Sequence, residues 1–401
     1  MSSQRLVCPG CSCLCDGLTL DTVSKAPIEV AHCNVGAAWF ASRTKPVTDS
    51  DFQIPDIQVS EIRTLLEKAG SPLITGIENL TTEAQQAAVK VAGRFFASID
   101  TGWSNAGRGS MASFQRYGTV TATLGEIANR SDVVVLWFCD PMKSHPRFIE
   151  RFIRNDGGPK KRLIVVDETN TQTTAIADEF ICIESAEANN FVQQLRTSID
   201  TEPQSDLVAQ LVAAKYGSVF VGKPKDTDAQ FDVATDQWFQ LVRSLNDHTR
   251  FVMGSLRNDR NGIGANNVLT SICGFPNAVR FTSSGPTWDG LEYSTESIIR
   301  RRECDLLIVC DVGGFEPFES HLDAETMAWL GTIPVVVLSD IAADKYQTST
   351  LHVPVGTPGW TTGGDFVRSD GVPIPMSALC SSLYGTELRG VLDLFNELLV
   401  T

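Results

Sequence analysis

Short runs of apolar and β-branched residues recur along most of the chain, and segments with helical spacing of apolar residues separate them. The run 132–138 precedes the helix-like segment 146–153, and the run 305–311 precedes 322–330. Strands covered on both faces by crossover helices have this pattern, which is typical of parallel sheets. The sequence therefore predicts an α/β fold with Rossmann-like, doubly wound parallel sheets.

The length of 401 residues indicates two or three packed units. The expected division, in chain order, is a cysteine-rich iron–sulfur type segment (1–50), a first α/β domain (51–215), a second α/β domain (216–345) and a C-terminal pocket-closing segment (346–401). The split between the α/β domains is placed near 202–218. The stretch 352–373 is rich in Gly and Pro and is predicted as a loop region.

The charge and the apolar pattern exclude some classes of function. A formal net charge of -15 repels phosphate backbones and anionic membranes, so we expect no nucleic-acid partner. No stretch approaches the roughly 18 apolar residues of a membrane helix, and Met1–Val7 carries no signal-peptide pattern. We therefore expect no membrane partner and a cytoplasmic location, where the 11 cysteines stay reduced.

Cysteines are concentrated at the N-terminus. Cys8, Cys11 and Cys15 stand in a C-x2-C-x3-C arrangement, and Cys33 follows at the predicted start of a helix. A tight loop with a remote fourth thiolate is typical of an iron–sulfur cluster, and anionic sulfur is favoured at a helix N-terminus. We therefore predict that these four residues are metal ligands, with a 4Fe-4S cluster as the possible cofactor.

Other interpretations of the cysteines stay open. Zinc accepts four thiolates at similar spacings, so the pattern does not decide between a cluster, zinc and unbound thiols. Cys13 is out of register with the motif and is predicted to be a packed bystander. The remaining six lie in apolar segments and are predicted to be small core residues: Cys139, Cys182, Cys273, Cys304, Cys310 and Cys380.

The segment 125–147 carries a specific resemblance. It reads G-E-I-A-N-R-S-D-V-V-V, then C-D-P-M-K-S-H-P-R from Cys139 to Arg147. With the N-terminal motif and 368–373, it resembles the B subunit of formylmethanofuran dehydrogenase, in the molybdopterin oxidoreductase superfamily. That family has G-E-V-x-N-R-A-D-V-V-V and C-N-P-M-x-x-H-P-R in the same order. The likeness extends over most of the chain.

The resemblance implies cofactor-binding residues around a pterin pocket. They lie in three loops that match the family: Lys143, His145, Arg147, Asn266, Arg368 and Asp370. The first three follow a strand, where doubly wound sheets bind ligands, and basic side chains there suit phosphates. Caps and turns are the plainer interpretation. The segment 359–364 lacks the glutamates that the family has there.

One departure concerns the metal of the redox-active members. They have D-N-T-A-x-x-C-H-G after the first long helix, and its cysteine or selenocysteine binds tungsten or molybdenum. The aligned segment 100–110 has Ala106 at the cysteine position and Gly107 at the histidine position. Soft thiolate ligation tunes such a metal, so we expect no catalytic residue here and no tungsten or molybdenum bis-pterin. Ser110 offers only a hard oxygen, and Arg108 adds a positive charge.

The resemblance implies three hypotheses. The first is the B subunit of a formyltransferase/hydrolase complex in tetrahydromethanopterin-linked one-carbon metabolism, a scaffold with the A, C and D subunits as partners and its own redox catalysis lost. The alternative is an active tungsten- or molybdenum-containing B subunit that reduces CO2 or oxidises formyl groups. The third is a non-catalytic iron–sulfur module of another assembly. The sequence gives neither the structure of the carrier, nor the stoichiometry, nor the direction of flux.

Overall fold

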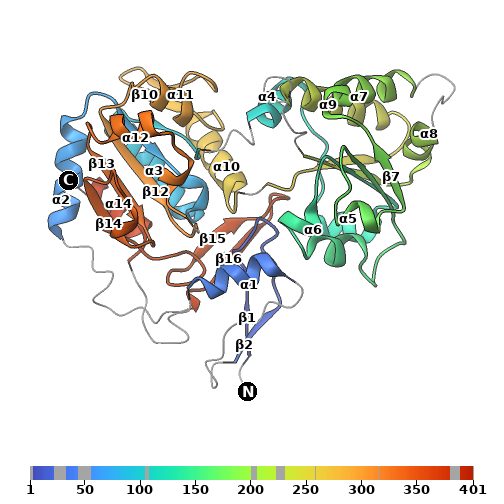
Figure 1. Ribbon diagram of the computed structural model, residues 1–401, viewed down its shortest axis with the longest axis horizontal. Helices are drawn as coiled ribbons and strands as arrows, with labels where there is room; N and C mark the ends of the chain where they lie inside the picture. The colour runs from blue at the N-terminus through green and yellow to red at the C-terminus, as the bar shows by residue number, and fades with distance from the viewer. Residues whose placement is uncertain are drawn as a thin grey trace.

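The chain forms two α/β lobes with an N-terminal segment at their junction (Figure 1). The computed structural model describes residues 3–21, 33–43, 56–103, 108–199, 206–222, 231–257, 259–314, 316–379 and 389–400. The expected Ala106 and Gly107 positions and Cys380 lie outside these ranges. Within them, no helix is long and apolar enough to span a bilayer.

The first lobe is built on a seven-stranded sheet. Its strands, in spatial order, are β11 (Gly285–Trp288), β10 (Val279–Thr282), β4 (Ser98–Ile99), β3 (Pro72–Thr75), β12 (Leu306–Asp311), β13 (Val335–Ser339) and β14 (Leu351–Pro354). The strands from β4 to β14 are parallel to their neighbours, whereas β10 runs antiparallel to both β4 and β11. The antiparallel edge departs from the purely parallel sheet that the sequence predicts.

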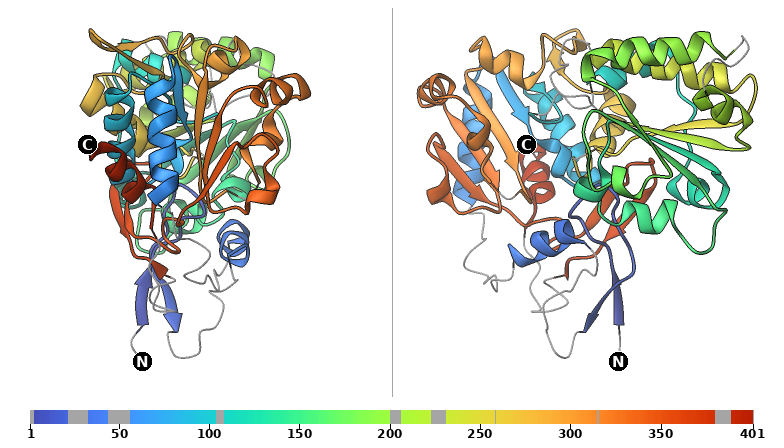
Figure 2. Two further views of the ribbon diagram at one scale, coloured as in Figure 1. Left: turned by 90° about the vertical axis from the view of Figure 1, so that its left-hand side faces the viewer. Right: turned by 45° about the vertical axis from the view of Figure 1, so that its right-hand side comes forward.

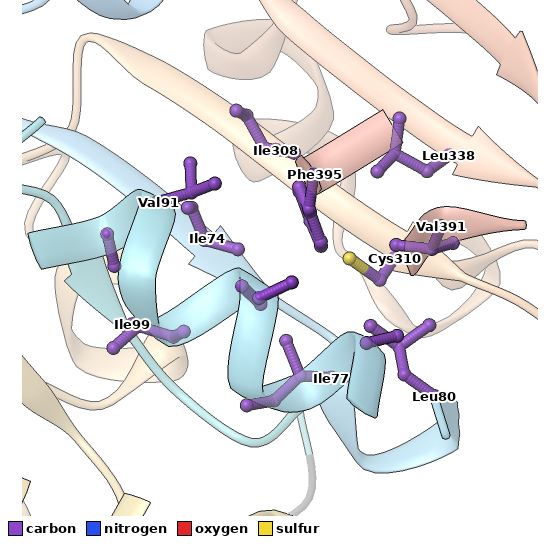
Figure 3. Close-up of a cluster of buried hydrophobic side chains, with 14 of the residues drawn as sticks. Ile74, Ile77, Leu80, Val91, Ile99, Ile308, Cys310, Leu338, Val391 and Phe395 are labelled. Atoms are coloured by element: carbon purple, nitrogen blue, oxygen red, sulfur yellow. The ribbon is translucent and has the colours of Figure 1, made fainter. Parts of the chain in front are cut away.

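Helices cover both faces of this sheet. They are α2 (Asp56–Lys68), α3 (Thr82–Arg94), α10 (Gly262–Cys273), α11 (Thr295–Arg300), α12 (Ala324–Leu330) and α14 (Val391–Leu399). Thr81 caps α3 by accepting from the backbone N–H of Ala84 over 3.3 Å, as expected of an N-cap threonine. Figure 3 shows Ile308 and Cys310 of β12 in the apolar layer with Phe395 of α14.

The second lobe has a five-stranded, fully parallel sheet. Its spatial order is β7 (Glu179–Cys182), β6 (Arg162–Asp167), β5 (Val133–Trp137), β8 (Gly217–Val221) and β9 (Phe251–Gly254). All five residues of β5 are buried because the strand lies at the centre of the sheet. The elements around the sheet are α4 (Arg108–Tyr117), α5 (Leu124–Arg130), α6 (Pro141–Ser144), a π-helical turn (Ile149–Ile153), α7 (Ala188–Thr197), α8 (Asp206–Ala213) and α9 (Phe231–Leu245).

The N-terminal segment packs against the second lobe. The hairpin of β1 (Ser3–Leu6) and β2 (Leu18–Asp21) holds the cysteine loop, and α1 (Asn34–Ala41) follows. Trp39 and Phe40 of α1 share a buried apolar cluster with Leu124 and Phe148 of the second lobe. Both views of Figure 2 show the hairpin of β15 (Gly364–Val367) and β16 (Pro373–Met376) close to this segment.

The predicted α/β fold with parallel sheets and a cysteine-rich N-terminus is confirmed, but the strands are not shared out in chain order. β3 lies between β4 and β12 in the first sheet, whereas β5 to β9, which separate β4 from β12 in sequence, form the second sheet. The first lobe is therefore discontinuous in sequence, unlike the expected 51–215 and 216–345. The predicted loop 352–373 also contains strand residues of β14, β15 and β16. The limits of independently folding domains stay a prediction.

Candidate functional site

The cysteine loop is a closed turn between β1 and β2. The backbone N–H of Cys8 donates to the carbonyl of Cys15 over 2.9 Å, and that of Leu14 donates to Cys11 over 3.2 Å. Gly17 and Leu14 both adopt positive φ, at 85° and 40°, which lets the chain reverse within a few residues. This reversal brings Cys8 and Cys15, at the two ends of the loop, next to each other.

The four predicted metal ligands lie close enough for Cys11, Cys15 and Cys33 to influence the pKa of Cys8, but in the described part of the chain their sulfurs do not form a group within 4.8 Å of one another. Cys33 is the N-cap of α1, as expected, and its sulfur accepts from the N–H of Gly36 over 3.3 Å. The sulfur of Cys8 accepts from the N–H of Gly10 over 3.4 Å. Burial raises the pKa of the Cys8 thiol, and repulsion from Cys11, Cys15 and Cys33 raises it further. Such a set needs a cation or a metal cluster to hold all four sulfurs as thiolates.

Arginine side chains supply positive charge next to these thiols. Burial raises the pKa of Cys15, while a hydrogen bond from Arg151 and the charges of Arg151 and Arg147 oppose that rise. Arg151 also pairs with Asp16, and Arg147 pairs with Glu150 at 2.7 Å. Arg147, which the sequence predicts as a phosphate ligand, pairs with Glu150 in the structure, and its charge also lowers the pKa of Cys15. Arg151 was missed, because only folding brings the π-helical turn beside the loop.

Cys13 has closer neighbours than predicted. Its side chain is buried, as expected of a packed residue, but its sulfur, that of Cys11 and a ring nitrogen of His145 all lie within 4.8 Å of one another. A hydrogen bond between the two thiols lowers the pKa of Cys11 and raises that of Cys13. The predicted burial of Cys13 agrees with the structure, and its side chain also lies in a group of three that could hold a metal ion.

His145 lies in the protein interior rather than on an open pocket wall. It is 1% exposed, and its Nε2 lies 3.0 Å from Ser12 Oγ and 3.1 Å from the carbonyl oxygen of Arg257. Burial lowers the pKa of His145 to about 4, so the ring is neutral at neutral pH. Lys143, two residues earlier, is exposed on α6. The two residues thus face different surroundings, although the sequence groups them.

Of the other predicted pocket residues, Asn266 and Asp370 border a cavity of about 580 Å³ between the lobes. Asn266 on α10 accepts from Arg257 over 2.6 Å, and Asp370 accepts from the N–H of Leu124 over 2.6 Å. Arg368 binds Asp370 through two nitrogens, at 2.8 and 2.7 Å. The wall also contains apolar side chains from both lobes: Phe114, Leu124, Ile127, Phe220, Phe239, Met253 and Ile263. The charged groups are paired with one another, so the cavity suits a largely apolar or aromatic ligand.

Glu78 is an acid that sequence reasoning missed. It follows β3 in a short 3₁₀ turn, and a side chain at Gly102 would collide with its carboxyl group. Burial raises the pKa of Glu78 to about 8, and the charge of Asp259 adds to the rise. Its position just after the carboxyl end of a buried strand is the signal that could have identified it.

The loop that leads to the predicted Ala106 and Gly107 positions starts beside Glu78. Asp100 is buried and accepts from the backbone N–H groups of Thr101, Ala278 and Thr295 at 2.8–3.1 Å. Trp103 stacks on Phe318 at 5.3 Å. The residues at 104–107 follow directly, outside the described part of the chain. The loop therefore leaves the carboxyl end of β4, at the junction of the lobes.

Relatives match the chain along nearly its whole length. The B subunit of the tungsten-containing formylmethanofuran dehydrogenase 2 of Methanocaldococcus jannaschii is 28% identical over 93% of this chain and 92% of that protein. Its counterpart from Methanococcus maripaludis is 27% identical and covers 93% of both. No family model matches the sequence.

Two solved structures share the fold. The formyltransferase/hydrolase complex of Methylorubrum extorquens, crystallised with methylofuran, contains a chain with a TM-score of 0.69 and 20% identity; the match covers 86% of this chain and 94% of that one. Acetylene hydratase from Pelobacter acetylenicus gives a TM-score of 0.63 at 12% identity, over 99% and 69% of the two chains.

The two lobes and the cysteine-rich N-terminus are thus a fold shared with both of these solved structures. The resemblance predicted from the sequence is confirmed. The chain is a relative of the formylmethanofuran dehydrogenase B subunit, and its fold matches a chain of the bacterial formyltransferase/hydrolase complex.

Proposed function

We propose that this chain is the B subunit of a formyltransferase/hydrolase complex in tetrahydromethanopterin-linked one-carbon metabolism, and that it acts as a scaffold. The observation that carries the proposal is Ala106 with Gly107, where redox-active relatives have a metal-binding cysteine and a histidine. A methyl group donates no electron pair to tungsten or molybdenum, and glycine has no side chain to move a proton. The residues do not fit a metal bis-pterin centre.

The arrangement of the cavity supports the loss. Arg368, predicted at the edge of the cofactor pocket, is engaged with Asp370, and Arg147, predicted as a phosphate ligand, is engaged with Glu150. A side chain already held by a carboxylate binds a phosphate only after that ion pair is broken. The cavity residues then serve to hold the two lobes together: Asp370 of the β15–β16 turn binds the start of α5 through Leu124.

Similarity over almost the whole chain supports a place in a multi-subunit assembly. The solved structure with the same fold is part of a formyltransferase/hydrolase complex, and we propose the A, C and D subunits of such a complex as the partners here. We place the complex in the cytoplasm, in keeping with reduced thiols at the N-terminus. Cell fractionation with an antibody against the chain tests the location.

We further propose that Cys8, Cys11, Cys15 and Cys33 hold a 4Fe-4S cluster. Three observations support the proposal: the thiols of the loop and of α1 influence one another's charge, backbone N–H groups reach two of the sulfurs, and two arginines lower the pKa of Cys15. When bound, a cluster of this type takes up and releases single electrons. In a scaffold its contribution is to hold the N-terminal segment on the second lobe.

The test uses the complex isolated through an affinity tag on this chain. Elemental analysis should give less than about a tenth of an atom of tungsten or molybdenum per chain, and formylmethanofuran should not reduce a viologen dye. Stoichiometric metal with dye reduction would overturn the scaffold role and establish the active dehydrogenase, which the gathered thiols favour. Absence of the A, C and D subunits from the isolate would favour an iron–sulfur module of another assembly.

A further inference from the structure

A group of three metal-ligating side chains lies beside the four-cysteine set. Cys11 and Cys13 come from the N-terminal loop, and His145 comes from the end of α6 in the second lobe; their ligand atoms lie within 4.8 Å of one another. Cys13 and His145 are each 1% exposed, whereas Cys11 is partly exposed. Two donors are therefore shielded from water, and the third gives an incoming ion access.

The hydrogen bonds around His145 allow the ring proton to leave Nε2 when an ion binds there. The Ser144 hydroxyl lies 3.1 Å from the carbonyl oxygen of Asp140 and 2.9 Å from His145 Nδ1. When the hydroxyl donates to the carbonyl oxygen of Asp140, its own oxygen accepts a proton carried on Nδ1. That tautomer gives Nε2, the nitrogen that faces the cysteine loop, an electron pair for a metal ion.

Without an ion, Nε2 lies 3.1 Å from the carbonyl oxygen of Arg257, which is an acceptor, so the ring proton is then on Nε2. Ser12 Oγ, 3.0 Å from Nε2, also donates its proton to this carbonyl oxygen, over 2.7 Å. An ion at Nε2 therefore displaces the ring proton to Nδ1, where the Ser144 oxygen accepts it. A buried imidazole with its second nitrogen held by a hydroxyl–carbonyl chain is the arrangement seen for metal-bound histidines, where the outer partner fixes the ring.

The distances suit one small ion. Zinc bonds of about 2.3 Å to sulfur and 2.0–2.1 Å to nitrogen place neighbouring ligands roughly 3.5–3.8 Å apart. Donor atoms within 4.8 Å reach that spacing by small side-chain rotations. Two thiolates and an imidazole are soft and borderline donors, which select zinc-like ions over Mg²⁺ or Ca²⁺.

We propose that Cys11, Cys13 and His145 bind a single zinc-type d¹⁰ ion with an open fourth position. The site is distinct from the four-cysteine set but shares Cys11 with it. One sulfur cannot complete both sites at once, so occupation by the ion and completion of a cluster exclude each other. The inference rests on the geometry of these residues and does not depend on the scaffold role.

The experiment separates the two sites by using Cys33→Ser, which removes a ligand of the four-cysteine set and leaves the three-residue group intact. The full chain is purified without metal under anaerobic conditions and titrated with Co²⁺ and Zn²⁺. We expect Cys33→Ser to bind one ion, with a cobalt spectrum that shows thiolate charge transfer and tetrahedral ligand-field bands.

Three further changes, each made in the Cys33→Ser background, test the site. Removal of a ligand, by Cys13→Ser or by His145→Gln, should weaken Zn²⁺ binding at least about tenfold. Ser144→Ala should also weaken binding by about tenfold, because it removes the hydrogen-bond partner that orients the imidazole. Cys33→Ser/Cys182→Ser removes an exposed thiol on β7 and is the matched control. Circular dichroism and melting curves show whether each variant folds.

The results decide between the sites. Loss of the ion in either Cys13→Ser or His145→Gln, without loss in the control, supports the proposal. If one of these two variants does not fold, the other is sufficient for the test. If Cys33→Ser binds no ion, or if both changes leave its affinity within threefold, the ion belongs elsewhere and the inference is overturned. A cobalt spectrum without thiolate charge transfer overturns it as well.

Discussion

The cysteine loop and the loop after β4 differ in whether they contain the metal-ligand side chains of the related proteins. In the first, the four cysteines predicted as metal ligands are present, and Cys8 is influenced electrostatically by the other three. In the second, the cysteine and histidine expected of a redox-active relative are replaced by Ala106 and Gly107. On the proposed scaffold function, the four cysteines have a role that does not need redox chemistry, and attachment of the N-terminal segment to the second lobe is such a role.

The electrostatic surroundings of the cysteine loop and of the loop after β4 also differ. Around the cysteines, burial raises the pKa of Cys15, and the charges of Arg151 and Arg147 reduce that rise. Next to the second loop, desolvation raises the pKa of the half-buried Glu78 to about 8, so it holds a proton at neutral pH. Positive charge thus partly offsets burial in the first region, whereas the acid beside the second loop is neutral.

The largest expected effect comes from removing a retained thiol. Cys8→Ser should reduce bound iron by more than about tenfold and lower the melting temperature, because metal binding contributes to the folding free energy of the segment. Iron and sulfide assays after anaerobic purification measure the first effect, and calorimetry measures the second. Cys304→Ser, at a buried cysteine outside the loop, is the control for loss of a thiol alone. Equal iron in both variants would show that Cys8 is not a ligand.

The second prediction concerns the acid beside the other loop. In the folded protein Glu78 keeps its proton up to about pH 8, whereas in the unfolded chain it releases it near its ordinary value of 4.5. The stability gained from the protonated form is complete below about 4.5 and is lost as the pH rises to about 8. Stability should thus fall by up to about 1.4 kcal/mol per pH unit in that window.

Glu78→Gln should remove this dependence, since the amide has no proton to lose. Urea denaturation between pH 5 and 9 measures the slope, and the variant should gain stability relative to the natural chain as the pH rises. Glu126→Gln, at an exposed partner of Arg130, is the control. A slope unchanged by Glu78→Gln would mean that other groups carry it, and that the second region is not kept neutral by this acid.

Arg151 offers a smaller test of the first region. Its guanidinium binds Asp16 and hydrogen-bonds the sulfur of Cys15. Arg151→Gln leaves more negative charge around a bound cluster, so the reduction potential should fall by an amount on the order of tens of millivolts. A redox titration followed by electron paramagnetic resonance measures it. Arg162→Gln, at an exposed ion pair with Glu179, should not change the potential. A shift in both variants would indicate a general charge effect.

Local features of the fold could be predicted from the sequence, and non-local ones could not. The run 133–137 is a strand because every side chain in it suits burial, and Thr81 caps α3 because its hydroxyl satisfies a backbone donor. The pairing of β3 with β12 joins segments more than 200 residues apart, and no local pattern specifies it. The individual strands could therefore be predicted from the sequence, but their assignment to the two sheets by chain order was wrong.

The same limit applies to the candidate site. The cysteine spacing and the helix start at Cys33 predicted a group of four thiols, because those constraints are local. The neighbours that change the chemistry come from elsewhere: His145 approaches Cys13, and Arg151 approaches Cys15, only through packing of the second lobe on the loop. Cys13 looked like a bystander because its true neighbour is more than 130 residues away.

The smallest effect is expected from restoring the missing pair. Ala106→Cys/Gly107→His returns the thiol and the imidazole to the second loop, but the segment 359–364 still lacks the glutamates of the redox-active family. A single thiolate does not rebuild a cofactor pocket whose other charged groups are paired with one another. The doubly substituted complex, produced in cells supplied with tungstate and molybdate, should contain no more of either metal than the unaltered complex and should not reduce viologen.

Ala106→Ser/Gly107→Ala is the control for bulk in the loop. Metal uptake by the cysteine–histidine form alone would mean that the pocket is otherwise intact, and that two substitutions separate a scaffold from a redox-active protein.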